Sequence, residues 1–282
     1  MSSATVETED PAAGDTPAYH ATSAHEPRSL LRSGHGEPLL LLHGVTGSAA
    51  MWKRVVPQLS EHHDVIAINA LGHRGGVNAA LRPVRIAHVV DDAERCLDEL
   101  GFDQVHLAGN SLGGWVALEL ARRGRARSVC ALSPAGIWEH SDPYASDKLR
   151  RIVQRARATR PLMPLLARLP WVRREALRDN ARHGERVTVR EMLELIDDLL
   201  GCTVSDDILA TTEQLGPLQA ACPITIAWAR YDRIFPVDVY GPRARALVPS
   251  AHYLVLEGVG HVPMLDDPEL VANTILASIA RA

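Results

Sequence analysis

The stretch that decides the fold runs from residue 105 to residue 124 and reads VHLAGNSLGGWVALELARRG. An apolar run at 105–108 leads into GNSLG at 109–113, and apolar residues then recur with helical period until Gly124. The pattern predicts a strand, a sharp turn and a helix. Small residues on both sides of Ser111 let the backbone turn tightly, which exposes the serine hydroxyl at the end of the strand. Helix N–H groups beside it would stabilise developing negative charge.

The composition is that of a globular protein of 282 residues with a formal net charge of −4. This charge gives no general attraction to nucleic acid or to acidic membranes. The four cysteines are far apart in the sequence, so neither a metal site nor another cofactor is predicted. The N-terminal sequence lacks an apolar signal core, and no apolar run approaches the roughly 20 residues of a membrane span, so we expect a cytoplasmic protein. The oligomeric state stays open.

The chain is predicted to consist of a tail, a core and an insertion in the core. Residues 1–18 are predicted to be a disordered acidic tail. Residues 19–137 and 207–282 alternate apolar runs with helical periods, which predicts an α/β core with a mostly parallel, doubly wound sheet of about eight strands. Buried strands are expected at residues 39–42, 65–68, 105–108, 128–132, 224–229 and 253–256. Helices are expected at residues 86–100, near 207–215, after Pro236, and after Asp267 as the capping residue.

The insertion, residues 138–206, contains helical segments separated by prolines and is predicted to be a helical cap. Its many arginines would either steer an anionic acyl donor or dock an acidic carrier protein, or else form the solvated faces of amphipathic helices. These arginines are Arg150, Arg151, Arg155, Arg157, Arg160, Arg168, Arg173, Arg174, Arg178, Arg182, Arg186 and Arg190. The interleaved apolar residues would line an acyl pocket or pack the cap onto the core.

Two further residues fit a reaction that begins at Ser111. A serine hydroxyl is a weak nucleophile at neutral pH, so it needs a base, and the base needs a third group that fixes its tautomer. Asp232 follows the predicted strand 224–229, and His261 follows the strand 253–256. Because the carboxyl ends of parallel strands lie at one edge of a sheet, we expect the three side chains to meet there.

At this point the sequence resembles the α/β-hydrolase family from about residue 30 to the C-terminus. The resemblance depends on His43-Gly44, on GNSLG around Ser111, on Asp232 ahead of Pro236, and on Gly260-His261. It implies Ser111 as nucleophile, His261 as general base and Asp232 as the orienting acid. It also implies an oxyanion hole made by the backbone N–H groups of Val45 and Leu112.

Other residues are candidates for the substrate pocket. Their alternative roles are structural: His43 would brace its own loop, as would His73, and the apolar residues would be core. The candidates are His43, His73, Trp138, Leu162 and Leu166. Related proteins often carry Asp-x-Pro-Gly-His-Gly in the loop after the second buried strand, where this chain has Asn69, Leu71 and Arg74 in place of Asp, Pro and the last Gly. The pocket wall near His73 is therefore expected to differ.

The predicted activity is hydrolysis of an ester or lactone in a small, largely apolar molecule through an acyl-enzyme intermediate. The alternatives are a thioesterase or carbon–carbon bond hydrolase of the same fold, or a ligand receptor with negligible turnover. Similar dehalogenases and epoxide hydrolases use aspartate where this chain has Ser111, which argues against those activities.

Overall fold

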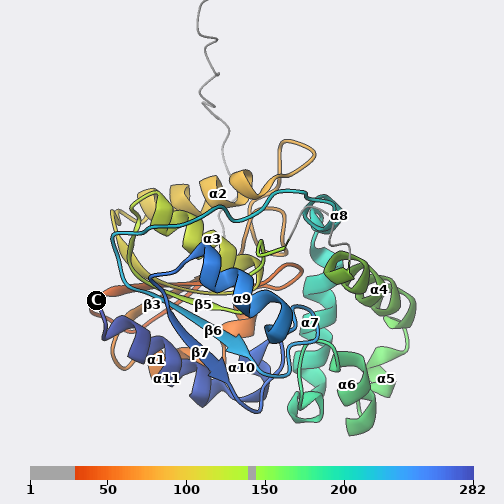
Figure 1. Ribbon diagram of the computed structural model, residues 1–282. Helices are drawn as coiled ribbons and strands as arrows, with labels where there is room; N and C mark the ends of the chain where they lie inside the picture. Colours follow the sequence, from red (N-terminus) through yellow and green to blue (C-terminus); the bar gives the residue numbers. More distant parts are fainter. Residues whose placement is uncertain (1–28, 139–143) are drawn as a thin grey trace, which may run out of the picture.

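The computed structural model describes residues 29–138 and 144–282, which form a seven-stranded sheet covered by helices on both faces (Figure 1). The strands are β1 (Leu30–Ser33), β2 (Pro38–Leu42), β3 (Asp64–Ile68), β4 (Val105–Asn110), β5 (Ala126–Leu132), β6 (Ile224–Ala229) and β7 (His252–Leu256). Their order in the sheet is β1-β3-β2-β4-β5-β6-β7, and only β1 is antiparallel to its neighbour. The predicted α/β fold with a mostly parallel sheet is confirmed, with seven described strands in place of about eight.

The central strands are buried on both faces, as their uninterrupted apolar sequences require. Leu39, Leu40 and Leu41 of β2 are fully buried, and β2 pairs in parallel with β3 and β4. Alternate residues along these strands point to opposite faces, so each strand contributes to two separate apolar clusters. The sheet is therefore the rigid layer from which the loops at its carboxyl edge project.

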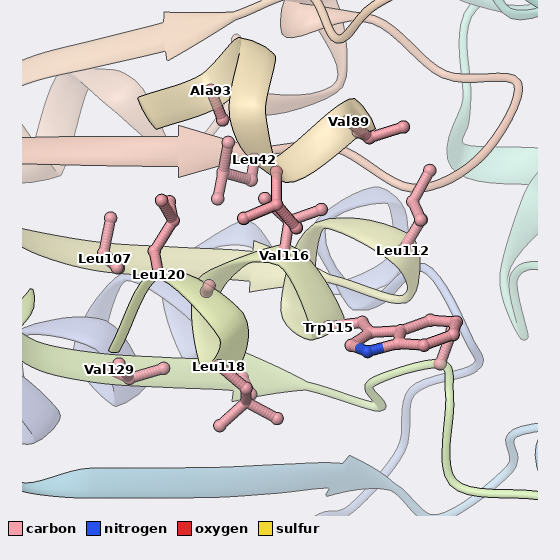
Figure 2. Close-up of a cluster of buried hydrophobic side chains, with 14 of the residues drawn as sticks. Leu42, Val89, Ala93, Leu107, Leu112, Trp115, Val116, Leu118, Leu120 and Val129 are labelled. Carbon is pink, nitrogen blue, oxygen red and sulfur yellow. The ribbon is translucent and has the colours of Figure 1, made fainter. Parts of the chain in front are cut away.

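One face of the sheet is covered by α2 (Ile86–Glu99), α3 (Leu112–Arg122) and α9 (Val237–Leu247). Figure 2 shows Val116 and Leu120 of α3 in one apolar layer with Val89 and Ala93 of α2 and with Leu42 and Leu107 of the sheet. The short η1 (Ala49–Trp52) and α1 (Val56–Leu59) cover the other face with α11 (Pro268–Ile279). As predicted, Asp267 caps α11, because its side chain accepts the Leu270 N–H at 2.9 Å.

Between β5 and β6 the chain forms a helical insertion, defined here as residues 144–209 (Figure 1, green to cyan). It contains α4 (Tyr144–Thr159), α5 (Met163–Leu166), α6 (Pro170–Leu177), η2 (Gly184–Arg186), α7 (Val189–Gly201) and α8 (Ser205–Leu209). Its helices lie together at one end of the sheet. No helix in the described residues is long and apolar enough to cross a membrane.

One predicted helix is wrong in extent. The helix expected near 207–215 is the five-residue α8, which ends at Leu209. The chain beyond it is irregular and tied to the core, because the Leu215 N–H donates to Gly136 O at 2.8 Å and the Leu218 N–H donates to Leu247 O at 2.8 Å. Leu215 and Leu218 are buried, so the apolar spacing there reflects core packing of an extended segment. The predicted tail 1–18 lies outside the described residues.

Candidate active site

Ser111 lies at the junction of β4 and α3 with a backbone conformation that L-residues rarely adopt. Its φ is 55° and its ψ is −116°. The conformation is maintained from both sides: the Ser111 N–H donates to Leu132 O at 3.0 Å, and Ser111 O accepts from Trp115 N at 3.1 Å and Ala135 N at 3.0 Å. Strain of this kind costs about 1–3 kcal/mol and persists only where surrounding structure enforces it. The serine side chain is thereby directed into a cavity at the edge of the sheet.

The glycines beside Ser111 are needed because of close backbone packing. A Cβ atom on Gly109 would lie 2.1 Å from Gly113 O, and one on Gly113 would lie 2.1 Å from Leu42 O. Neither glycine has a positive φ, so the requirement is space and not a left-handed conformation. The start of α3 therefore packs directly against the end of β2.

His261 and Asp232 form a buried pair in the loops after β7 and β6. The Nδ1 atom of His261 lies 2.7 Å from Oδ2 of Asp232, and the two side chains are 5% and 0% exposed. The other oxygen of Asp232 accepts the N–H groups of Ile234 at 2.9 Å and Phe235 at 2.7 Å. Because a carboxylate only accepts, the proton belongs on Nδ1. That tautomer leaves Nε2 as a proton acceptor.

Ser111 and His261 line the same cavity, which brings the predicted nucleophile and base to one place. No hydrogen bond joins their side chains among the bonds of the described residues. Such contacts are often long without substrate and shorten when the reacting complex forms. The buried side chain of Asn110 connects the two residues, because its Nδ2 donates to Leu132 O at 3.2 Å and to His261 O at 2.9 Å. Sequence reasoning missed this role, although Asn110 stands inside the GNSLG motif.

The two predicted oxyanion donors belong to the residue after Ser111 and to the loop after β2. Leu112 is the first residue of α3, so its N–H has no acceptor within the helix. Val45 lies in the loop after β2 and lines the cavity. Gly44 allows this loop to pack onto the serine, since a Cβ atom at Gly44 would be 3.3 Å from Cβ of Ser111. Thr46 turns the loop with a φ of 63°.

His43, which begins this loop, and His73 do not line the cavity, which corrects two predicted pocket residues. His43 bridges two loops: its Nδ1 lies 2.8 Å from Gly44 O, and its Nε2 accepts the Ala70 N–H at 3.0 Å. His73 Nδ1 lies 3.0 Å from Leu71 O. Burial, reinforced by His43, lowers the pKa of His73 to about 3, so this ring is neutral at physiological pH. Both histidines therefore have the structural role that was the alternative.

Two further pocket predictions are also corrected, and one residue lies where it was expected. Trp138 packs edge-to-face on Trp115, with ring centroids 5.4 Å apart, and donates to Glu213 O at 3.2 Å. Leu162 is 61% exposed just before α5. Leu166, at the end of that helix, does line the cavity. The helical period of the insertion does not reveal which face of each helix turns toward the core.

The cavity has a volume of about 310 Å³ and lies between the carboxyl edge of the sheet and the helical insertion. Its sheet side carries Ser111, His261 and the loop after β2. Its insertion side is mainly apolar and includes Leu149, Ile152, Val153, Met163, Leu166, Val172, Leu177, Met192, Leu195, Ile196 and Leu199. Such a lining suits a small, largely apolar molecule.

Asp266, at the end of the short helix α10 (Pro263–Asp266), fastens the histidine loop to the insertion. This buried carboxylate accepts the N–H groups of Gly260 at 2.7 Å, Arg182 at 2.9 Å and His183 at 2.7 Å. One acid thus satisfies backbone donors from both sides of the cavity. The sequence gives no local signal for this role, because the three donors are backbone groups from two distant segments.

Within the described residues, no cluster of three or more His, Cys, Asp or Glu side chains has the arrangement of a metal site. The chain belongs to the alpha/beta hydrolase family, because the model of that family matches residues 39–274.

Several known proteins are similar to this chain in sequence or in fold. Epoxide hydrolase EphH from Mycobacterium tuberculosis is 36% identical over 208 residues, which are 68% of this chain and 94% of that protein. The fold resembles a thermophilic esterase from Thermogutta terrifontis, with a TM-score of 0.69 and 22% identity over 88% of this chain and 91% of the esterase. It also resembles 2-hydroxy-6-oxo-6-phenylhexa-2,4-dienoate hydrolase from Rhodococcus sp. strain RHA1, with a TM-score of 0.68 and 20% identity over 92% of this chain and 98% of that enzyme.

Proposed function

We propose that the protein is a serine hydrolase that cleaves a carboxylic ester or lactone in a small, largely apolar substrate. The observation that carries the proposal is the buried 2.7 Å contact between His261 Nδ1 and Asp232 Oδ2, made by a histidine that shares a cavity with Ser111. The apolar wall of that cavity favours a substrate whose acyl or alcohol group is apolar. No cofactor takes part in the proposed reaction.

The proposed reaction has two halves. In the first, Ser111 Oγ attacks the substrate carbonyl while His261 Nε2 takes the hydroxyl proton, and Asp232 stabilises the resulting imidazolium. The tetrahedral oxyanion accepts hydrogen bonds from the N–H groups of Leu112 and Val45. His261 then gives its proton to the departing alcohol oxygen, which leaves an ester between the acyl group and Ser111. In the second half, His261 takes a proton from water as the water oxygen attacks the acyl carbon. The bond between that carbon and Ser111 Oγ then breaks, His261 returns the proton to Oγ, and the acid is released.

Backbone contacts support this assignment of roles. The strained conformation of Ser111 and the packing of Gly44, the residue before Val45, against Ser111 support the proposal that the two N–H donors act on a carbonyl bound at this serine. Removing one oxyanion donor typically costs about 10²–10³ in rate, which shows how much such fixed donors contribute. The hydrogen bonds of Asp232 to two backbone N–H groups keep the carboxylate oriented toward His261.

Epoxide hydrolysis is the second candidate, because a relative at 36% identity is named an epoxide hydrolase. In similar epoxide hydrolases an elbow aspartate opens the ring and forms an alkyl ester. Ser111 occupies that position here, so the proposal favours an acyl substrate. Thioester and carbon–carbon bond cleavage use the same nucleophile and stay as alternatives within the proposed mechanism, and a ligand receptor is the non-enzymatic alternative.

A substrate panel tests the proposal. We expect 4-nitrophenyl butyrate or a γ-lactone to be hydrolysed faster than a matched thioester, a β-diketone or styrene oxide. Ser111→Ala should lower kcat for the ester by about 10⁶-fold. Ser60→Ala, which removes a hydroxyl in the loop after α1, is the matched control and should retain wild-type turnover. Wild-type rates in Ser111→Ala, or preferential turnover of the epoxide, would contradict the proposal.

A further inference from the structure

A second cavity of about 320 Å³ lies between the helical insertion and the loop that carries Asp232. Its lining consists of Lys148, Arg151, Ile152, Arg155, Arg178, Asp179 and Arg233. Five of these seven residues are basic and one is acidic. The insertion contributes all of them except Arg233, which directly follows Asp232.

The basic cavity adjoins the cavity of Ser111. Ile152, Arg155 and Asp179 line both. The two sides of the basic cavity are joined by Lys148, whose Nζ donates to Arg233 O at 2.5 Å. A molecule whose carbonyl lies beside Ser111 can therefore extend along α4 toward these basic side chains.

Acidic partners account for two of the five cations of this cavity, Lys148 and Arg178, and Arg178 also pairs with Glu175 at 2.6 Å. Asp179 lies 3.2 Å from Nζ of Lys148 and 3.9 Å from Nε of Arg178, so it is shared between two cations. Arg151, Arg155 and Arg233 have no carboxylate within 4.0 Å among the described residues. Cations that converge on a hollow without counter-charges repel one another and raise the positive potential there.

Three other insertion arginines have partners away from the basic cavity. Arg160 pairs with Asp197 at 2.7 Å, and Arg190 pairs with Glu194 at 3.1 Å. Arg173 donates to the backbone oxygens of Ala167 and Glu185. These arginines connect parts of the insertion, and none of them lines either cavity.

We propose that the basic cavity binds an anionic oxygen group, a carboxylate or phosphate, at the end of the substrate remote from the bond that is cleaved. The inference rests on the proposed ester hydrolysis and defines its substrate class as an ester with an apolar middle and an anionic end. Guanidinium groups match carboxylate and phosphate oxygens with paired hydrogen bonds, so several arginines suit this ligand. The apolar cavity would hold the middle of the chain.

Three 4-nitrophenyl esters test the inference: the neutral hexanoate, the adipate half-ester with a free carboxylate, and 6-phosphonooxyhexanoate. We expect wild-type kcat/KM to be at least tenfold higher for one or both anionic esters than for hexanoate at low ionic strength. The preference should weaken in 0.5 M NaCl, because salt screens partly exposed charges. The better of the two anionic esters identifies the group.

Arginine variants locate the effect. Arg151→Gln and Arg233→Gln should each lower the ratio of anionic to neutral kcat/KM about five- to tenfold. Arg157→Gln is the matched control, because it removes the same charge from α4 at a residue that lines neither cavity. Equal kcat/KM for all three esters, or the same ratio in the Arg151, Arg233 and Arg157 variants, would overturn the inference.

Direct binding separates this inference from the proposed function. Calorimetry with adipate and with inorganic phosphate should detect binding of at least one anion to the wild-type protein, and the Arg151→Gln, Arg233→Gln double variant should bind it at least tenfold more weakly. If no ester is hydrolysed but this difference is found, the anion site stands and the proposed function fails. If esters are hydrolysed and neither anion binds, only the anion site fails.

Discussion

The carboxyl edge of the sheet and the helical insertion bound the same cavity but are built differently. At the sheet edge, each candidate catalytic group is held by several short contacts to core backbone, as with Asp232 and its two N–H donors. The insertion is held to the core mainly by side-chain hydrogen bonds and ion pairs, including those of Asp266 and the pair of Arg74 with Asp198 at 2.8 Å. From this comparison we propose that the core carries the residues of the proposed reaction and that the insertion selects its substrate.

The largest expected effect is at the sheet edge. Asp232→Asn should keep the fold but lower kcat for a 4-nitrophenyl ester by about 10⁴-fold, because an amide favours the wrong histidine tautomer. Asp238→Asn, an exposed position in the first turn of α9, is the control. Steady-state kinetics beside circular dichroism measures both. Turnover within tenfold of wild type in Asp232→Asn would mean that the carboxylate does not orient the base.

Glycine substitutions compare how tightly the two regions are packed. Gly113→Ala should lower the free energy of unfolding by about 3 kcal/mol, because its Cβ would lie 2.1 Å from Leu42 O and backbone cannot easily move away. Gly201→Ala, at the end of α7, should change it by less than about 1 kcal/mol, since its nearest neighbours are side-chain atoms of Arg74, from 3.0 Å. Urea unfolding gives both values. Similar losses of unfolding free energy in the two variants would show that the two regions are packed equally tightly at these glycines.

Neighbouring aspartates test the anchor between the two regions. Asp266→Asn should lower the free energy of unfolding by about 2 kcal/mol, because an amide nitrogen would face buried N–H donors. Asp267→Asn should cost only a few tenths of a kcal/mol, since asparagine caps helices about as well as aspartate.

Hydrogen exchange at Arg182 and His183 provides a second readout for Asp266. These amides should exchange faster in Asp266→Asn than in Asp267→Asn. Unchanged exchange would show that the carboxylate does not hold the insertion.

His73 lies at the contact between the two regions and makes the stability of the protein depend on pH. It lies next to Gly72, whose carbonyl oxygen accepts the Thr203 N–H at 2.9 Å. Burial lowers the pKa of His73 from 6.5 to about 3, so between these values the unfolded chain binds a proton that the folded chain excludes. The contribution of His73 to the free energy of unfolding is therefore fully present above pH 6.5. It is lost as the pH falls below that value, by up to about 1.4 kcal/mol per pH unit.

Urea unfolding between pH 7 and pH 4 checks this contribution. The stability of His73→Gln should fall less steeply with decreasing pH than that of the wild type. Parallel curves would exclude His73 as the source.

Sequence reasoning predicted the groups that depend on local motifs and missed those that depend on tertiary packing. The positions of Ser111, Asp232 and His261 at strand ends follow from the alternation of strands and helices, and the structure brings them together at one edge. Asp266 escaped notice because its partners are backbone groups from remote segments. The sequence predicted that arginines of the insertion could steer an anionic acyl donor, but arginine spacing does not show which of them converge on one cavity or have acidic partners.

The predicted pocket residues illustrate the same limit. Loops and helices have more than one face, and the sequence does not specify which of their side chains meet the cavity. The residues that do not line the cavity are His43, His73, Trp138 and Leu162.

The most direct test of the central claim is covalent labelling of the folded protein with a fluorophosphonate. The account predicts the addition of one phosphonyl group, located on Ser111 by peptide mass spectrometry. It also predicts slow labelling of His261→Gln, because the hydroxyl then lacks its base. Failure of the wild-type protein to react, or attachment at another residue, would contradict the assignment of Ser111 as an activated nucleophile.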